Sequence, residues 1–441
     1  MAQPTVNLIP NGDFRQAQRG GNGLLPARWE VHAPLEGLRP TFRRTTHEGG
    51  RALMIGGNGE ADCFGWAATA FPLPAGQTYR LRARFQITPD MNPQQNLAFC
   101  IIAPGFNHGL FRFHRQPNLW VEAEERFYVP GEGTLQAEAQ IVFRFSPRGK
   151  VWVQEMALEP CEPIPPRWVK VACCDGEGDL AHWRQVLRAA GEAHADLALL
   201  PETFAGSDHW ETLRGPACAL MSEMARRHHM YVAGTVYNEN PAIGRRYNAG
   251  VLYDRGGAVV GVYYKNHPYT PELYMGVTPG TEVPVFRADF GTVGMMICYD
   301  SWFTDVCELL ALKGAEIVLF PCAGYYRSLM PARAADNGVR IVASCLHRAN
   351  GGRGVWDTSG ADVTNPDADP SRRAGDEITF RNVRELPELG LLLVELDLSK
   401  SPAPANWGGP MRSAPGGRRN RREQKRLLYE ELMREQCRWW E

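Results

Sequence analysis

Residues 1–160 alternate apolar and polar positions with a period of two. Runs such as Thr78–Phe85, Leu97–Ile102 and Val151–Leu158 are separated by Gly, Pro and Asn residues that favour turns. Successive side chains of a β-strand point to opposite faces of its sheet, so these runs predict strands with one buried face. No helical period stands out in this part of the chain. The pattern therefore predicts an all-β sandwich domain over residues 1–160.

A proline-rich connector follows this domain. Residues Pro160–Pro166 read P-C-E-P-I-P-P. Proline lacks a backbone N–H and fixes φ, so such a run cannot enter a helix or a central strand and makes a stiff connector instead. We expect the domain boundary here.

Beyond the connector, apolar strands alternate with amphipathic helices. Asp179 is expected to cap a helix, and Pro216 to open a second one that ends near His228. A third predicted helix covers Phe303–Lys313 and is ended by Gly314. The predicted strands are Trp168–Cys173, Asp196–Leu200, Met230–Tyr237, Tyr247–Tyr253, Ala258–Tyr264, Val283–Ala288, Gly291–Ile297, Ala315–Phe320, Val339–Ser344 and Leu391–Leu396. This order predicts a layered α/β domain over residues 167–400.

Residues 401–441 form a predicted C-terminal arm. Pro, Gly and Arg dominate Ser401–Arg422, whereas Glu423–Trp440 has the apolar spacing of an amphipathic helix. We expect the arm to dock on its own domain or on a partner subunit.

The composition argues against several classes of protein. The 441 residues carry a net charge of -1, so the basic excess typical of nucleic-acid binders and membrane-surface proteins is absent. The 11 cysteines have neither a repeated spacing nor a zinc-type spacing, which argues against a disulfide framework and a metal site. The N-terminus does not resemble a signal peptide, and no apolar run is long enough to cross a membrane. We expect a cytoplasmic protein that needs no cofactor and acts on a small molecule.

Three residues with reactive or charged side chains follow apolar strands. Glu202 lies in L-A-L-L-P-E-T-F, Lys265 in G-V-Y-Y-K-N-H, and Cys298 in M-M-I-C-Y-D-S-W-F. Sites in α/β sheets form where strands end. Taken singly, each residue also fits an ordinary role: a solvated turn glutamate, a solvated lysine, or a small core cysteine.

Together, the three side chains would suffice for acyl transfer. A free thiol has a pKa near 8.5, about a unit and a half above neutral pH, so it needs a base to become a nucleophile. A carboxylate can take the proton, and an ammonium group can stabilise the oxyanion that follows. The backbone N–H groups after Cys298, beginning with Tyr299, are candidates for a second oxyanion donor.

Residues 167 to about 400 resemble the carbon–nitrogen hydrolase family, also called the nitrilase superfamily. The resemblance lies in A-D-L-A-L-L-P-E, Y-Y-K-N-H, I-C-Y-D-S-W-F, K-G-A-E-I-V-L-F-P and A-R-A-A-D-N-G-V-R-I-V-A-S. It implies a four-layer αββα sandwich, assembly into a homodimer or larger homo-oligomer, and amide, carbamoyl or nitrile substrates. It also implies that Glu202 is the general base, Lys265 the oxyanion stabiliser and Cys298 the nucleophile that forms a thioester. Glu272 resembles a second glutamate beside this triad.

Two departures from the family pattern bear on the substrate. Thr304-Asp305 stands where many members have Pro-Glu, although Asp305 still places an acid near a helix start. No arginine follows the cysteine motif, which weakens the case for a carboxylated substrate. Trp302 and Phe303 are expected either to line an apolar substrate pocket or to belong to the core.

The N-terminal segments N-L-I-P-N-G-D-F, P-A-R-W-E-V and V-W-V-Q-E-M-A-L resemble galactose-binding-like jelly rolls of carbohydrate-binding modules. The resemblance implies a sugar ligand, with Trp120 as a candidate for stacking, and a structural calcium ion with Asp13 as a candidate ligand. Alternatively, the module shapes the active-site mouth or an oligomer interface.

The favoured interpretation is a thiol hydrolase that cleaves a non-peptide carbon–nitrogen bond in a small amide or N-carbamoyl compound. The first alternative is a nitrilase that acts on a nitrile. The second is a non-catalytic binding or scaffold protein.

Overall fold

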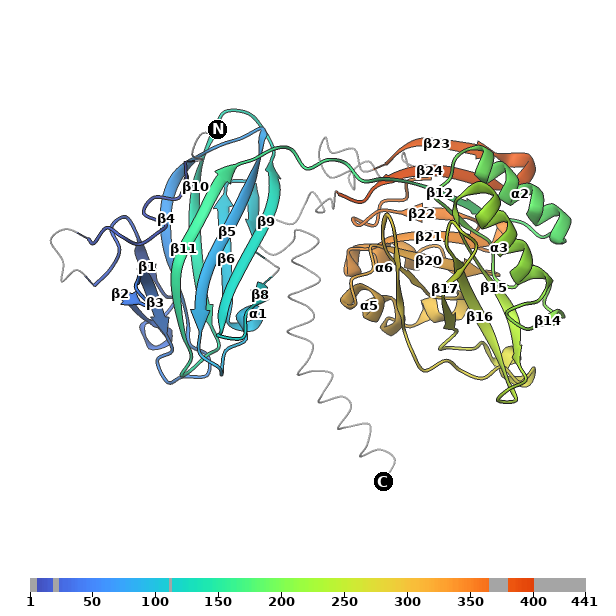
Figure 1. The fold of residues 1–441 in the computed structure, drawn as a ribbon, viewed down its shortest axis with the longest axis horizontal. Coiled ribbons are helices and arrows are strands. Elements are labelled where there is room, and N and C mark those ends of the chain that lie inside the picture. The colour runs from blue at the N-terminus through green and yellow to red at the C-terminus, as the bar shows by residue number, and fades with distance from the viewer. Residues whose placement is uncertain (1–5, 19–23, 111–112, 365–379, 400–441) are drawn as a thin grey trace, which may run out of the picture. The chain divides into compact units, whose positions relative to one another are not determined.

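The computed structural model describes residues 6–18, 24–110, 113–364 and 380–399. The chain divides between Pro165 and Pro166 into an N-terminal unit and a second unit. Figure 1 shows strands dominating the first unit and both strands and helices in the second. The predicted arm, residues 401–441, lies outside the described residues.

The N-terminal unit is a sandwich of two antiparallel sheets. The five-stranded sheet has the order β1-β4-β10-β6-β7, and the six-stranded sheet the order β2-β3-β11-β5-β9-β8. The strands are β1 Glu30–His32, β2 Thr41–His47, β3 Gly50–Gly56, β4 Phe64–Pro74, β5 Gln77–Ile87, β6 Leu97–Ala103, β7 Phe106–Gly109, β8 Phe113–Arg115, β9 Trp120–Val129, β10 Thr134–Arg144 and β11 Lys150–Pro160. The described part of this unit also contains the short helix α1 Pro93–Asn96 and the 3-10 turn η1 Glu36–Leu38.

The two sheets of the sandwich share one hydrophobic core. The rings of Phe85 on β5 and Phe99 on β6 stack across it with their centroids 4.9 Å apart. Burial alternates strictly along β6, where every second residue from Leu97 to Ala103 is buried. The period-two pattern in the sequence therefore corresponds to side chains that point in turn to the core face and to the outer face of the sheet.

Two expectations for the sandwich are wrong or lack support. Trp120 is only 4% exposed, because its indole N–H donates to Glu48 at 2.8 Å and the Arg84 guanidinium covers its ring at 4.2 Å. It is therefore not available to stack on a sugar. Asp13 is paired with Arg15 at 3.2 Å, and the described residues contain no cluster of three or more His, Cys, Asp or Glu side chains that could hold a metal ion.

The second unit contains two sheets and several helices. The larger sheet has the order β17-β16-β15-β13-β12-β24-β23, with β14 paired to β15, and the smaller the order β18-β19-β20-β21-β22. The strands are β12 Trp168–Cys174, β13 Leu197–Leu199, β14 Trp210–Glu211, β15 Tyr231–Asn240, β16 Arg245–Tyr253, β17 Val259–Tyr264, β18 Val285–Ala288, β19 Gly291–Met295, β20 Ile317–Cys322, β21 Arg340–Cys345, β22 Gly354–Trp356, β23 Phe380–Leu386 and β24 Leu391–Asp397. The α-helices are α2 Leu180–Glu192, α3 Pro216–His228, α4 Thr270–Tyr274, α5 Asp305–Leu312 and α6 Leu329–Asn337.

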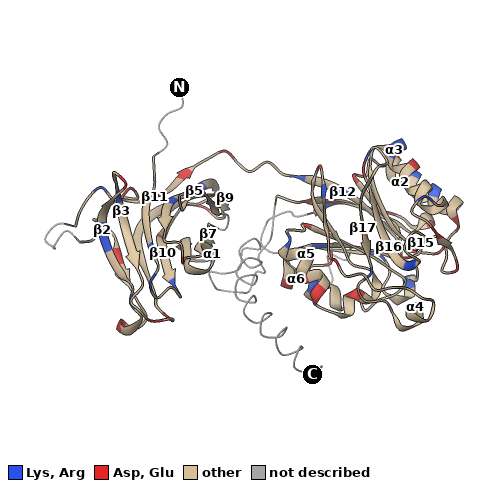
Figure 2. Ribbon diagram, turned by 60° about the horizontal axis from the view of Figure 1, so that its bottom comes forward, with Lys and Arg blue, Asp and Glu red and all other residues tan. Residues whose placement is uncertain are grey.

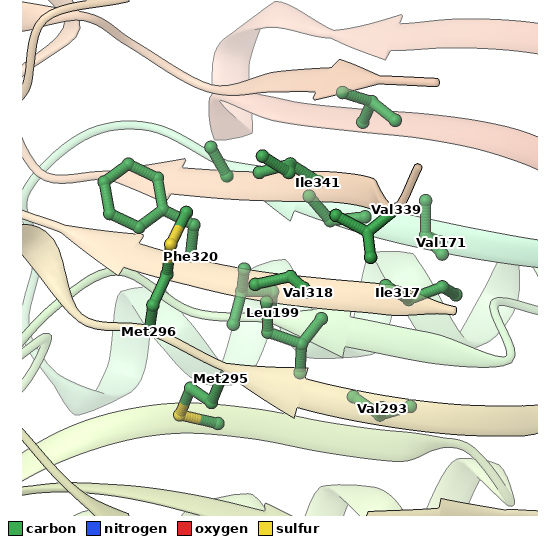
Figure 3. Close-up of a cluster of buried hydrophobic side chains, with 14 of the residues drawn as sticks. Val171, Leu199, Val293, Met295, Met296, Ile317, Val318, Phe320, Val339 and Ile341 are labelled. Atoms are coloured by element: carbon green, nitrogen blue, oxygen red, sulfur yellow. The ribbon is translucent and has the colours of Figure 1, made fainter. Parts of the chain in front are cut away.

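Strand β12 shows how the layers of this unit arise. Val169, Val171 and Cys173 face a core shared with the smaller sheet, whereas Ala172 and Cys174 face a second core that includes buried residues of α2 and α3. A strand that is apolar on both faces is buried on both sides. Figure 3 shows the shared core, with Val171 and Leu199 near Ile317, Val318 and Ile341. Helices α5 and α6 pack on the smaller sheet, where α6 contacts β21 and β22.

Most of the predicted elements of this unit are present with small shifts at their ends. The expected helix cap is confirmed, because the Asp179 side chain accepts a hydrogen bond from the His182 N–H at 2.8 Å. The helix at Pro216 ends at His228 as predicted. Acidic and basic residues are interspersed in Figure 2, which agrees with the near-zero net charge. Among the described residues, no helix is both long and apolar enough to span a membrane.

Candidate active site

Four predicted site residues meet in the second unit, although they are far apart in the sequence. Glu202 follows β13, Lys265 directly follows β17, and Glu272 lies in α4. Cys298 begins the 3-10 helix η2, Cys298–Trp302, which connects β19 to α5. The structure thus brings together one thiol, one ammonium group and two carboxylates.

Lys265 is the centre of this cluster. Its Nζ atom lies 2.8 Å from Glu202 Oε1 and 2.6 Å from Glu272 Oε2, and the side chain is 1% exposed. Burial by itself lowers the pKa of a lysine, but the charges of Glu202 and Glu272 outweigh it and hold the Lys265 pKa above its ordinary value. An ammonium group has three N–H donors, and two are used here. The third has no hydrogen-bond partner among the described residues, and we expect it to meet a substrate oxygen.

Asn248 on β16 fixes the two carboxylates relative to each other. Its Nδ2 atom donates to Glu202 Oε1 and to Glu272 Oε1, both at 2.8 Å, and its side chain is fully buried. Backbone N–H groups hold the second oxygen of each carboxylate. Ala323 donates to Glu202 Oε2 at 2.9 Å, and Tyr269 donates to Glu272 Oε2 at 2.7 Å. Each carboxylate therefore has a defined orientation. The sequence analysis missed Asn248, because an asparagine within a strand carries no signal of its own.

Cys298 sits on a strained turn beside this cluster. Its φ angle is 44°, in the left-handed region that side chains other than glycine seldom adopt. The thiol donates to the Gly324 carbonyl oxygen at 3.6 Å. Burial, and then the charge of Glu202, raise the pKa of Cys298 well above its ordinary value, while Lys265 opposes them. The resting group is thus a thiol, and a base must remove its proton before attack.

Tyr299 and Trp302 belong to a group of aromatic side chains on the loops that carry the cluster. The Tyr299 ring lies 5.3 Å from Tyr269 and 5.8 Å from Trp302, and Trp302 lies 4.9 Å from Tyr326. Trp302 is 49% exposed and Phe303 39%, so the expectation that they belong to the core is wrong. Asp305 lies in the first turn of α5, as expected for an acid near a helix start.

Part of this unit is similar in sequence to known hydrolases. Residues 164–367 match the family model for carbon-nitrogen hydrolase. The chain is 26% identical over 208 residues to the N-carbamoylputrescine amidase of Solanum tuberosum, which covers 40% of this chain and 68% of the relative. It is 26% identical over 218 residues to an omega-amidase of Bos taurus, which covers 44% of this chain and 78% of the relative.

Among solved structures, an amidase from Nesterenkonia sp. is similar with 23% identity and a TM-score of 0.42, over 53% of this chain and 92% of that one. Residues 164–367 are therefore similar to carbon–nitrogen hydrolases, and both of these curated relatives are amidases.

Proposed function

We propose that the second unit hydrolyses the carbon–nitrogen bond of a small amide or N-carbamoyl compound through a cysteine thioester. The observation that carries the proposal is a buried ammonium group held between two carboxylates beside a thiol on a strained turn. In this proposal Cys298 is the nucleophile, Glu202 the general base, and Lys265 the oxyanion stabiliser. Glu272 and Asn248 hold Lys265 and Glu202 in place.

Acylation begins when Glu202 takes the thiol proton and the Cys298 sulfur attacks the substrate carbonyl carbon. The carbonyl oxygen gains the negative charge, and the free N–H of Lys265 donates to it. The backbone N–H of Tyr299 is a second candidate donor. When the tetrahedral intermediate collapses, the carbon–nitrogen bond breaks and the leaving nitrogen takes the proton from Glu202. Ammonia or an amine departs, and the acyl group remains on sulfur as a thioester.

Deacylation uses the same three residues, with water in place of the thiol as the nucleophile. Glu202 removes a proton from water, and the resulting hydroxide attacks the thioester carbon. Lys265 again stabilises the oxyanion. Collapse breaks the carbon–sulfur bond, the sulfur regains its proton from Glu202, and the acid product leaves. Atoms and charges balance over the cycle with one water consumed.

The aromatic group favours an apolar or aromatic substituent on the substrate. Tyr299 and Trp302 follow the nucleophile directly, and Tyr326 follows the backbone at Ala323 and Gly324 that contacts Glu202 and Cys298. Partly exposed rings at such a place bind flat or apolar groups well. Lys265 contacts the carboxylates of Glu202 and Glu272, whose negative charge disfavours a carboxylated substrate.

A nitrile is the second candidate substrate. The chain is 29% identical over 175 residues to a nitrilase of Pyrococcus abyssi, covering 36% of this chain and 65% of the relative. Cys298 would attack the nitrile carbon in the same way, and both reactions end in an acid and ammonia, so only the substrate that is turned over separates the two functions.

The remaining features of the molecule complete the proposal. We propose that the second unit is a four-layer αββα sandwich, supported by α2 and α3 on the larger sheet and α5 and α6 on the smaller one. We further propose that the enzyme assembles as a homodimer or larger homo-oligomer. The N-terminal sandwich is proposed to be a jelly-roll-like accessory module, with a sugar as its candidate ligand.

Intact-protein mass spectrometry tests the proposal. The protein is mixed with iodoacetamide and, separately, with simple amides, N-carbamoyl amines and nitriles, and released ammonia is measured in parallel. Wild type should be alkylated first at Cys298 and should show an acyl adduct there, whereas Cys298→Ala should show neither. Cys161→Ala, which removes a partly exposed cysteine of the other unit, is the matched control and should behave as wild type.

The outcomes distinguish the candidates. Turnover of amides or carbamoyl compounds supports the main proposal, and acid production from nitriles alone supports the nitrilase. A Cys298 that reacts no faster than Cys161, with no turnover of any compound, would refute the proposed chemistry and favour the scaffold interpretation.

A further inference from the structure

Asp300 is a buried carboxylate that lies two residues after the nucleophile and is not part of the proposed chemistry. Its side chain is fully buried and accepts four hydrogen bonds. Oδ2 accepts from the Ile297 N–H and the Tyr263 hydroxyl, both at 2.8 Å. Oδ1 accepts from the His267 N–H at 2.9 Å and is 3.0 Å from His267 Nδ1. A buried charge is tolerated only when it is satisfied in this way.

The partners of Asp300 lie on both sides of the two central site residues. Tyr263 and His267 are two residues before and two residues after Lys265. Ile297 immediately precedes Cys298, and its amide closes the turn that holds Cys298 in the left-handed region. One carboxylate therefore joins the segment that carries the ammonium group to the turn that carries the thiol.

His267 extends this connection to α5. Its Nδ1 atom faces Asp300, its Nε2 atom lies 3.3 Å from Asp305 Oδ2, and its ring stacks on Phe303 at 4.1 Å. The charged groups that face the ring are thus Asp300 from η2 and Asp305 from α5, while Tyr263 from β17 donates to Asp300. Each ring nitrogen meets a carboxylate, so the arrangement needs a proton on both. The hydrogen bond that the His267 ring donates to Asp300, and the charge of Asp305, accordingly raise the pKa of His267 against the effect of burial.

We propose that Asp300 and His267 are positioning residues, which act by holding the Cys298 thiol in register with the Lys265 ammonium group. The proposal rests on the proposed function, because it assigns the two residues to that reaction. The strained turn would relax if its connection to the lysine segment were cut, since a non-glycine residue keeps φ > 0 only when its surroundings enforce it. Asp305 favours the doubly protonated form of the His267 ring, which can donate to Asp300 and Asp305 at the same time.

Three variants test the proposal. His267→Ala removes the two ring contacts, with Asp300 and Asp305, at a position that is only partly buried, and it keeps the backbone N–H that donates to Asp300. Because the ring ties η2 and α5 to the lysine segment, kcat should fall on the order of 10²-fold with KM little changed, as for a reacting group misplaced by about 1 Å. His267→Asn offers an amide N–H in place of Nδ1–H and should recover much of that loss. Asp305→Asn should shift the alkaline limb of the kcat profile to lower pH by roughly half a unit to one unit, because it removes one of the two charges that favour the imidazolium.

His209→Ala is the matched control. His209 pairs with the buried Glu211 at 2.9 Å, the same kind of contact outside the cluster, so its loss should leave kcat and the pH profile unchanged. Wild-type kcat in His267→Ala, or an unshifted profile in Asp305→Asn, would overturn the proposal. A third outcome would also overturn it: His267→Asn has the same kcat and the same lowered melting temperature as His267→Ala. That pattern is expected when the contact serves only to stabilise the fold.

Failure of the proposed function can be told apart from failure of this inference. If the wild type turns over no compound, the proposed function fails, and the rate of Cys298 alkylation still reports on the connection. A thiol moved away from Lys265 loses the charge that favours its thiolate, so His267→Ala should be alkylated more slowly than wild type. An unchanged alkylation rate would overturn the inference by itself.

Discussion

Replacing Lys265 with methionine should separate its catalytic role from its structural role. Methionine has a similar length but no charge, so the buried volume is kept while the ammonium group is lost. Glu202 and Glu272, 4% and 5% exposed, would then face each other across the single Nδ2 group of Asn248. Breaking a buried ion pair by removing one partner costs about 3–5 kcal/mol. For a domain of this size, each kcal/mol lowers the melting temperature by roughly 2–4 °C.

The loss of stability in this variant should depend on pH. Two buried carboxylates without a cation cannot both stay ionised, so one should take up a proton in the folded state. An unfolded glutamate releases its proton near about pH 4.3. Above that pH the folded variant binds more protons than the unfolded chain, and its stability must therefore fall as pH rises. Relative to wild type, the variant should recover stability as pH is lowered from 8 towards 5.

The assay compares thermal unfolding between pH 5 and 8 with kcat for wild type, Lys265→Met and Lys265→Met/Glu272→Gln. The single variant should lose a factor of about 10²–10³ in kcat, as expected for the loss of one oxyanion donor. The double variant, which removes one of the two facing charges, should regain stability and its flat pH dependence but not activity. A single variant as stable as wild type at every pH would refute the description of Lys265 as the cation that neutralises this buried cluster.

Three further predictions concern the site and the two units. Glu202→Gln removes the proposed general base, so hydrolysis should be lost and alkylation of Cys298 at neutral pH should become slower. An unchanged alkylation rate would contradict the assignment of Glu202 as the base that takes the thiol proton. Trp302→Ala should lower kcat/KM about 10-fold for aryl-substituted amides relative to acetamide, because about 1.4 kcal/mol of aromatic contact is lost. An equal effect on both substrates would exclude a role of Trp302 in substrate selectivity. A fragment of residues 166–441 should keep selective alkylation at Cys298, since the contacts described for the cluster lie within the second unit. A fragment that aggregates would show that the sandwich is needed for folding.

The sequence placed Glu202, Lys265 and Cys298 after recognisable apolar strands, and this placement agrees with the structure. Strand ends are also where it was least accurate. The strand predicted to run to Ile297 ends at Met295, because the Ile297 amide turns to meet Asp300 and cannot continue the sheet. Hydrophobicity continues through Ile297, so no periodicity marks this change.

Other features could not be predicted from the pattern, because they depend on contacts between distant segments. Asn248 becomes important only when β16 places it between two glutamates that come from different loops. Trp120 looks like an exposed aromatic on an alternating strand, yet Glu48 and Arg84 cover it. Helix α6 was missed, because Leu329–Asn337 carries only a few buried positions and no side-chain cap.

The left-handed backbone at position 298 limits how this protein can be improved by directed evolution. An L-residue held at positive φ carries a penalty of roughly 1–2 kcal/mol that glycine does not. A library screened for heat resistance alone would therefore enrich Cys298→Gly, which is more stable but lacks the proposed nucleophile. Each round of selection must therefore screen for product formation as well as thermal stability, because the residue that favours stability at this position is not the one that the proposed reaction needs.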